Sequence, residues 1–218
     1  MRLSEVTWTD ALTAEAVAER GVAAADRPVV IGPTVPVGVA EEHRQFTGTC
    51  WVSPDTFRAY VRETVASLAS HGWDRVVVVN GHGGNVPALG EVCARLARDE
   101  TAYAVPFTWF DAVDLPDDLA MGHGGAVETS VVRAVHPELV REERLAEGAA
   151  DGAERWGEWV SGTNLAHDTA EFSANGTVGD PTESDPELGE ALLEAAGEAL
   201  ADLLAAVAER DGAPPDHR

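Results

Sequence analysis

The sequence predicts an α/β fold, a three-layer α/β/α sandwich around a mainly parallel sheet. Two observations support this fold class. Apolar runs of strand length alternate with helical patterns along the chain. Residues 76–79 are four consecutive valines, and a β-branched run without polar alternation is typical of a parallel strand that helices cover on both faces. We find no internal repeat and no linker, so residues 1–218 are expected to form a single domain with a disordered tail at about 211–218.

The turn after the valine strand carries the strongest functional signal. It reads NGHGGN at residues 80–85 and leads into a helical pattern that begins at Val86. Its glycines allow positive φ and close backbone approach, and they hold His82 just past the end of the strand, where ligands collect in open α/β sheets. Three interpretations stay open: a metal or catalytic histidine, a phosphate-binding turn, and a plain turn whose histidine caps the helix. The phosphate fingerprints GxGxxG and GK[ST] are absent.

The other elements are predicted from apolar spacing and capping residues. In chain order they are a helix from Asp10, its N-cap, to about residue 25, a strand at 28–31 with an extension at 35–39, a helix from residue 54, a strand at 103–107, a helix that opens at 122–126, and a last helix from residue 186. Pro106 weakens the strand prediction at 103–107, because proline cannot donate a ladder hydrogen bond.

The charge balance of the chain is strongly acidic. Its 218 residues include 38 acidic and 15 basic side chains, a formal net charge of −23, and all the basic residues are arginine. Nucleic acids and anionic membranes would be repelled, so neither is a predicted partner. Acid spread over the whole chain is typical of proteins from salt-loving organisms, with an acidic mesophilic enzyme as the alternative. Because the sequence has no apolar leader, no membrane-spanning run and only two cysteines, we expect a cytoplasmic protein without disulfides.

A second glycine turn also holds a histidine. Residues 121–125 read MGHGG, with His123 in the middle, and Glu128 lies on the helix that follows. Imidazole and carboxylate side chains are ligands of Zn²⁺ and Mn²⁺, and such a metal activates water and polarises a carbonyl group. This chemistry suits the hydrolysis of an amide. The spacing is not a compact HExxH or CxxC pattern, so it indicates the chemistry without defining a metal site.

Four motifs in the same order resemble the creatininase (creatinine amidohydrolase) family. They are VGVAEEHRQFTGT at 37–49, NGHGGN at 80–85, GHGGAVETS at 122–130 and TVGDP at 177–181. The resemblance runs from about Thr9 to the last helix. It implies the creatininase-like α/β/α fold, a homo-oligomer, a divalent metal site and hydrolysis of an amide C–N bond. The expected substrate is a small non-peptide or cyclic amide, although members that open formamido groups or trim a peptide are also known.

The resemblance also implies a role for several side chains. Asp10, His82 and Glu128 would hold Zn²⁺ or Mn²⁺, with Fe²⁺ as an alternative, and His123 would transfer a proton at the scissile bond. The residues expected to bind substrate are His43, Asn80 and Asn85. From the sequence alone, the alternative for Asp10 is a simple helix cap, and the alternative for His123 is a loop histidine bonded to backbone. The remaining histidines are interpreted as surface or structural residues: His71, His136, His167 and His217.

One segment of the family pattern has no counterpart here. Members normally carry a core strand and an ExHGxHxP loop, with two metal ligands, shortly before the Thr9-Asp10 pair, which here follows directly on Trp8. Loss of that strand would expose a sheet edge and apolar surface. A second hypothesis is therefore a shortened, impaired member that acts as a binding or scaffold subunit. A phosphate or nucleotide binder is a third. Gly84 stands where creatinine-hydrolysing members have a glutamate ligand, which argues against creatinine as the substrate.

Overall fold

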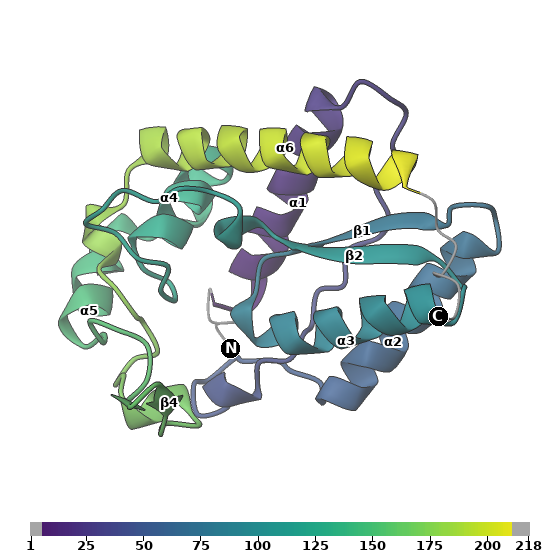
Figure 1. The fold of residues 1–218 in the computed structure, drawn as a ribbon. Coiled ribbons are helices and arrows are strands. Elements are labelled where there is room, and N and C mark those ends of the chain that lie inside the picture. Colours follow the sequence, from purple (N-terminus) through teal and green to yellow (C-terminus); the bar gives the residue numbers. More distant parts are fainter. Residues whose placement is uncertain (1–5, 211–218) are drawn as a thin grey trace.

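Two parallel strands lie at the centre of the molecule between two layers of helices (Figure 1). The computed structural model of the protein describes residues 6–210, so the predicted tail at 211–218 lies outside the described part. The helices are α1 (Val6–Ala24), α2 (Pro54–Ala69), α3 (Val86–Arg98), α4 (Ala126–Val135), α5 (Leu145–Ala150) and α6 (Pro186–Glu209). The strands are β1 (Arg75–Asn80), β2 (Tyr103–Thr108) and a short hairpin of β3 (Trp159–Val160) and β4 (Thr163–Asn164). Within residues 6–210, none of the helices combines the length and apolarity that a membrane span requires.

The predicted valine strand is confirmed as β1. It pairs in parallel with β2, from Arg75 opposite Tyr103 to Asn80 opposite Thr108. Successive side chains point to opposite faces: Val76 and Val78 pack with α2 and α3, whereas Val77 and Val79 pack with α1 and α6. Helices cover both faces as predicted, but the four valines are only half-buried. One edge of β1 faces a cavity instead of a third strand.

The predicted strand at 28–31 and its extension at 35–39 are wrong. Residues 28–36 are extended but form no backbone–backbone hydrogen bond with any described residue. Val30 is 64 % exposed and Ile31 is 49 % exposed. Pro28, Pro33 and Pro36 remove three of the N–H donors that a ladder would need, so apolar composition alone does not make this segment a strand.

Two apolar cores lie on either side of the sheet. One joins α2 and α3 to the strands, and the other joins α1, α4 and α6 to the strands and Trp109. Helices α1 and α6 approach closely because Gly21 lies against Leu200, and the pair Arg20–Glu190 closes the contact at 2.6 Å. Helices from both ends of the chain therefore cover the same face of the sheet (Figure 1).

Two of the predicted helices begin at a side-chain cap, whereas the predicted cap Asp10 is not one. Ser53 caps α2 by accepting from the N–H of Thr56, and Asp185 caps α6 by accepting from the N–H of Glu187. Asp10 is not a cap, since α1 begins at Val6 and carries Asp10 in its second turn. No proline or glycine interrupts the helix before that point, and the Asp10 carboxylate is thereby free for another partner.

The contact between α4 and α6 supplies a stability test. A side chain at Gly189 would collide with the carbonyl oxygen of Ser130, so Gly189→Ala should lower the free energy of unfolding by about 1–3 kcal/mol through overpacking. Gly90 on α3 is exposed and has no atom near its missing Cβ. Gly90→Ala should therefore raise stability by about 0.5–1 kcal/mol through helix propensity. Denaturant unfolding of both variants measures the two effects, and equal effects of the two changes would contradict this packing.

Candidate active site

The turn after β1 is fixed by the side chain of Asn80. Its Oδ1 accepts from the N–H of His82 at 3.2 Å, and its Nδ2 donates to the carbonyl of His82 at 2.9 Å and to Oγ1 of Thr108 at 3.1 Å. Glycines let other segments approach this turn, because a side chain at Gly81 would collide with the carbonyl of Asp10 and one at Gly84 with Val39. The sequence thus places His82 rigidly at the carboxyl end of the strand.

His82 lies between two carboxylates from distant segments. Its Nδ1 is 3.3 Å from Oδ2 of Asp10, and its Nε2 is 3.2 Å from Oε1 of Glu42 and 2.8 Å from the carbonyl of Val39. Burial alone would lower the pKa of His82, but the hydrogen bonds to Asp10 and Glu42 outweigh it and raise the pKa to about 10. In the protein without metal, His82 is therefore an imidazolium ion in a buried ion-pair network.

His43 and His123 form a stacked pair beside this network. Their ring centroids are 4.1 Å apart, and the ring of Trp156 meets both edge-on. The hydroxyl group of Thr169 is 3.0 Å from Nδ1 of His43 and fixes that ring. Burial lowers the pKa of both imidazoles, to about 3 for His123, where the neighbouring His43 adds to the effect. Both rings are therefore neutral near pH 7, and their buried Nε2 atoms have no hydrogen-bond partner among the described residues.

Glu128 completes the group from the first turn of α4. It is buried, and its Oε2 accepts from the N–H of Gly124 at 2.5 Å. Burial, and then the nearby negative charge of Asp10, raise the pKa of Glu128 above its usual range. Two neighbouring carboxyl groups, one of them buried, favour a shared positive charge, either a proton or a cation.

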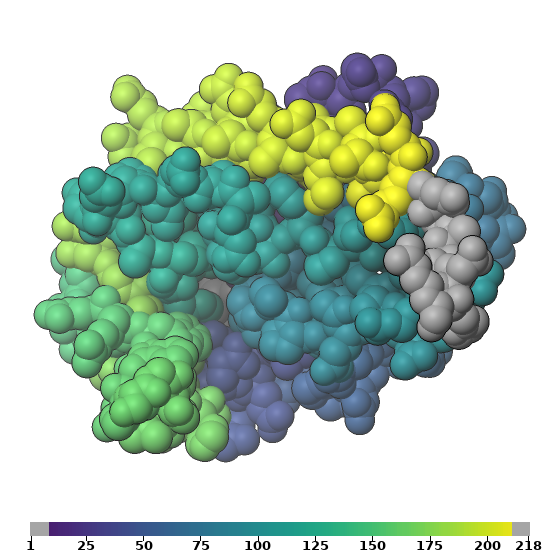
Figure 2. All heavy atoms as spheres, viewed as in Figure 1, coloured from purple at the N-terminus to yellow at the C-terminus, as the bar shows by residue number. Residues whose placement is uncertain are grey.

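One cavity of about 480 Å³ joins these side chains. The surface is hollowed between the green segment that follows α5 and the blue-green segment that follows β1 (Figure 2). The residues that line this site cavity include Asp10, Glu42, His43, His82, His123, Glu128, Trp156, His167 and Thr169. The structure thus brings together all three predicted metal ligands, the predicted proton-transfer histidine and His43.

The other predicted site residues have different positions. Asn80 and Asn85 use their side chains internally: Asn85 Nδ2 donates to Asn80 Oδ1 at 3.2 Å, and Asn85 Oδ1 accepts from the N–H of Val39 at 2.8 Å. They hold the turn and the loop together, and their contact with substrate stays a prediction. His167, interpreted from sequence as a surface or structural residue, lines the cavity. His217 lies outside the described residues.

The donor set suits a metal ion, although the side chains do not form a finished metal site. Within residues 6–210, no three His, Cys, Asp or Glu side chains are arranged to hold an ion. Carboxylate and imidazole groups are nevertheless the ligands of Zn²⁺ and Mn²⁺, and the Nε2 atoms of His43 and His123, which have no hydrogen-bond partner among the described residues, could coordinate an ion. Asp10 and His82 currently neutralise each other, so a metal ion would replace the proton that they share.

Sequence reasoning missed three residues of the site. Glu42 stands directly before His43 in the loop motif, so its position in that motif was a usable signal. Trp156 and Thr169 come from a region with little periodicity, residues 142–170. No local sequence pattern there predicts that these two residues lie in the site. They reach the site only because the tertiary fold brings that region against His43.

Comparisons with known proteins agree with this geometry. The family model described as creatinine amidohydrolase matches residues 6–204. A mycofactocin precursor peptide peptidase of Mycolicibacterium smegmatis is 35 % identical over 185 residues, which are 84 % of this chain and 69 % of that protein.

Solved structures show the same fold. A Bacteroides fragilis protein that has been proposed as a creatinine amidohydrolase superposes with a TM-score of 0.77 at 26 % identity, over 93 % of this chain and 83 % of that one. A mutant creatininase of Zn–Zn type superposes with a TM-score of 0.71 at 25 % identity, over 89 % and 81 % of the two chains. The predicted α/β fold class is confirmed, and the chain belongs to the creatininase family, whose named relatives are hydrolytic enzymes.

Proposed function

We propose that the protein is a metal-dependent amidohydrolase that cleaves an amide C–N bond of a peptide. The observation that carries this proposal is the convergence of Asp10, His82, Glu128 and His123 in one cavity at the carboxyl end of β1. The relative that is 35 % identical is named as a peptide peptidase, which favours a peptide over a small cyclic amide. The small non-peptide amide expected from the sequence is the alternative substrate class.

Asp10, His82 and Glu128 are the residues that would hold the metal ion. Solved relatives are described as a Zn–Zn form and a Mn form, which supports these two metals. When bound, such an ion polarises the amide carbonyl and makes water a nucleophile at neutral pH. Binding requires that His82 lose its extra proton, and the carboxylate of Glu42 beside it keeps the ring oriented toward the site.

His123 is the residue that would move the proton. Its imidazole is neutral, and its buried Nε2 has no hydrogen-bond partner among the described residues, so the ring can hold a transferred proton only briefly. The same burial makes the protonated ring a strong acid, which releases the proton readily to the leaving nitrogen. His43 supports this ring by stacking on it, and the hydroxyl of Thr169 holds His43 in place.

A second candidate function is a binding or scaffold subunit without turnover. The observation that favours it is the ion pair between Asp10 and His82, which occupies two of the expected metal ligands with each other. Metal content separates the two candidates directly. We propose a homo-oligomeric assembly and adaptation to high salt for either function. Because of the proposed salt adaptation, the tests below use molar KCl.

The first prediction concerns metal and activity together. Protein purified in molar KCl and supplied with Zn²⁺ or Mn²⁺ should bind metal stoichiometrically and hydrolyse peptide amides. His82→Ala should lose the metal, as measured by mass spectrometry. His123→Ala should keep the metal and lose about 10²–10⁴-fold in kcat, the usual share of an acid–base group. His136→Ala, outside the site cavity, is the control and should change neither. A folded protein without metal or hydrolysis would favour the scaffold candidate.

The second prediction concerns the charge on His82 in metal-free protein. NMR titration of the imidazole should give a pKa of about 10, and Glu42→Gln should lower it. Because the folded pKa is raised above the unfolded value of about 6.5, the stability from this group is fully present below pH 6.5 and is lost as the pH rises through 10. The difference in unfolding free energy between the wild type and His82→Asn should therefore shrink over that interval. A difference that is constant from pH 6 to 10 would contradict the charged state.

A further inference from the structure

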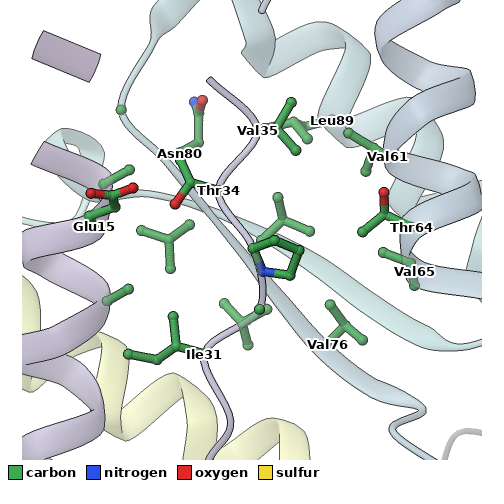
Figure 3. A pocket seen from close by; sticks show the side chains of 18 of the residues that line it. Glu15, Ile31, Thr34, Val35, Val61, Thr64, Val65, Val76, Asn80 and Leu89 are labelled. Atoms are coloured by element: carbon green, nitrogen blue, oxygen red, sulfur yellow. The ribbon is translucent and has the colours of Figure 1, made fainter. Parts of the chain in front are cut away.

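The loop that carries His43 reaches the site from an extended segment that lacks backbone pairing. Residues 28–36 form no backbone–backbone hydrogen bond with any described residue. Figure 3 shows Val35 on this segment, among the residues that line the cavity beside β1. The chain is tied to the turn after β1 at Val39, whose N–H donates to Oδ1 of Asn85 at 2.8 Å. The orientation of His43 therefore depends on contacts that the loop makes farther along the chain.

A distant segment, residues 168–178, contacts both members of the stacked histidine pair. The hydroxyl group of Thr169 is 3.0 Å from Nδ1 of His43. The backbone of Val178 exchanges two hydrogen bonds with the backbone of His123, at 2.8 and 3.0 Å. One segment thus holds the ring of His43 and the backbone of His123, and the two rings stack with their centroids 4.1 Å apart.

The start of this segment is bound to the loop through the side chain of Asp168. Its Oδ2 accepts from Nη2 of Arg44 at 2.8 Å and from Nε2 of Gln45 at 2.6 Å. The backbone of Asp168 is fixed in turn, because its N–H donates to Oε1 of Glu171 at 2.8 Å. The Asp168 side chain is only 20 % exposed. A charge-assisted hydrogen bond in such a position is stronger than a neutral one and is partly shielded from salt.

We propose that Asp168 is a positioning residue, which holds His43, and through it the ring of His123, in the orientation that proton transfer requires. This inference rests on the proposed function and adds to it a residue outside the site cavity. Asp168 binds the two residues that follow His43, and the residue that follows Asp168 binds His43 itself. Because the two links are adjacent in both segments, they fix the angle between the segments as well as the distance.

The stacked rings depend on such support for their orientation. The Nε2 atoms of His43 and His123 have no hydrogen-bond partner among the described residues, so no bond on that side fixes either ring. The rings lie nearly parallel, with an interplanar angle of 16°, and this arrangement lasts only while both backbones stay in place. A displacement of about 1 Å, caused far from the reacting atoms, can cost about 10²-fold in rate. Loss of the Asp168 contact should therefore slow proton transfer without removing any group from the site cavity.

The alternative is that Asp168 forms an ordinary surface ion pair. Exposed pairs of arginine and a carboxylate contribute little to stability and orient no functional group. The chain offers such a pair for comparison, since Arg58 of α2 lies 2.6 Å from Glu91 of α3, and neither residue lines the site cavity. Glu91→Ala is therefore the matched control for Asp168→Ala.

Two probes that differ in their leaving group test the role of Asp168 in the metal-loaded protein. The leaving group of acetyl-Ala-Gly-amide is an alkyl amine, which must take up a proton in order to leave. The leaving group of acetyl-Ala-p-nitroanilide is a weakly basic aniline, which depends less on that proton. Asp168→Ala should lower kcat for the first probe about 10–100-fold and for the second probe much less, with KM and metal content little changed. An equal loss for both probes would overturn the role in proton transfer.

Further variants assign the loss to the contact itself. Asp168→Asn keeps an oxygen acceptor and should recover most of kcat, whereas Glu91→Ala should change neither kcat nor KM. Arg44→Ala/Gln45→Ala breaks the same contact from the loop and should lose as much as Asp168→Ala. Because one contact is broken in either case, the combination of all three changes should cause little further loss. Additive losses would overturn the proposal. Gln45→Ala removes one of the two bonds and serves if Asp168→Ala does not fold.

An NMR measurement on metal-depleted protein separates failure of this inference from failure of the proposed function. Each stacked ring shields the other, so the imidazole Hε1 resonances of His43 and His123 report on the stack. Asp168→Ala should shift both resonances, and Glu91→Ala should shift neither. Unchanged resonances in Asp168→Ala, when the wild type hydrolyses the probes, would overturn the inference and keep the proposed function. Shifted resonances in a protein whose wild type hydrolyses neither probe would overturn the proposed function and leave Asp168 only the placement of the two rings.

Discussion

The imidazole of His82 between two carboxylates is the contact on which the rest of the site depends. It joins α1 through Asp10, the loop at 41–43 through Glu42 and the end of β1 through its own backbone. Three segments that are distant in sequence thereby meet at one ring. The carboxylates of Asp10 and Glu42 are partly buried on either side of this ring, and a positive charge on the imidazole offsets the cost of burying them.

Two imidazoles in the same cavity have opposite charge states. His82 is held as a cation by its carboxylate neighbours, whereas His123 is kept neutral by burial and by the adjacent His43. Environments that push the pKa values of neighbouring groups apart are how one site separates the tasks of binding charge and moving protons. His43 and His123 are buried in the stacked pair with Trp156 at its edge, and this burial preserves the difference.

The sequence predicted those features that depend on a short local pattern. It did not predict those that depend on contacts with residues distant in the chain. The valine strand, the turn at 80–85 and the helix with Glu128 follow from short patterns, and the structure contains all three. The strand prediction at 28–31 failed because an apolar segment becomes a strand only through a ladder of backbone hydrogen bonds. Pro28, Pro33 and Pro36 remove N–H donors, and residues 28–36 form no such bond with any described residue. The prediction of Asp10 as a metal ligand depended on the family resemblance, because the residues next to it in the sequence suggested a helix cap. Trp156 and Thr169 were unpredictable because their position depends on tertiary contact alone.

The pairing of α1 with α6 has a consequence for how the protein is made. Arg20 and Glu190 are 170 positions apart, and Val17 is buried in the core that α6 completes. At the usual pace of synthesis, α1 waits roughly 10–30 s for this partner to emerge. Throughout that time α1 packs only on β1 and α4, without the helix that completes its core. The candidate site therefore reaches its final packing only when the last helix closes the domain.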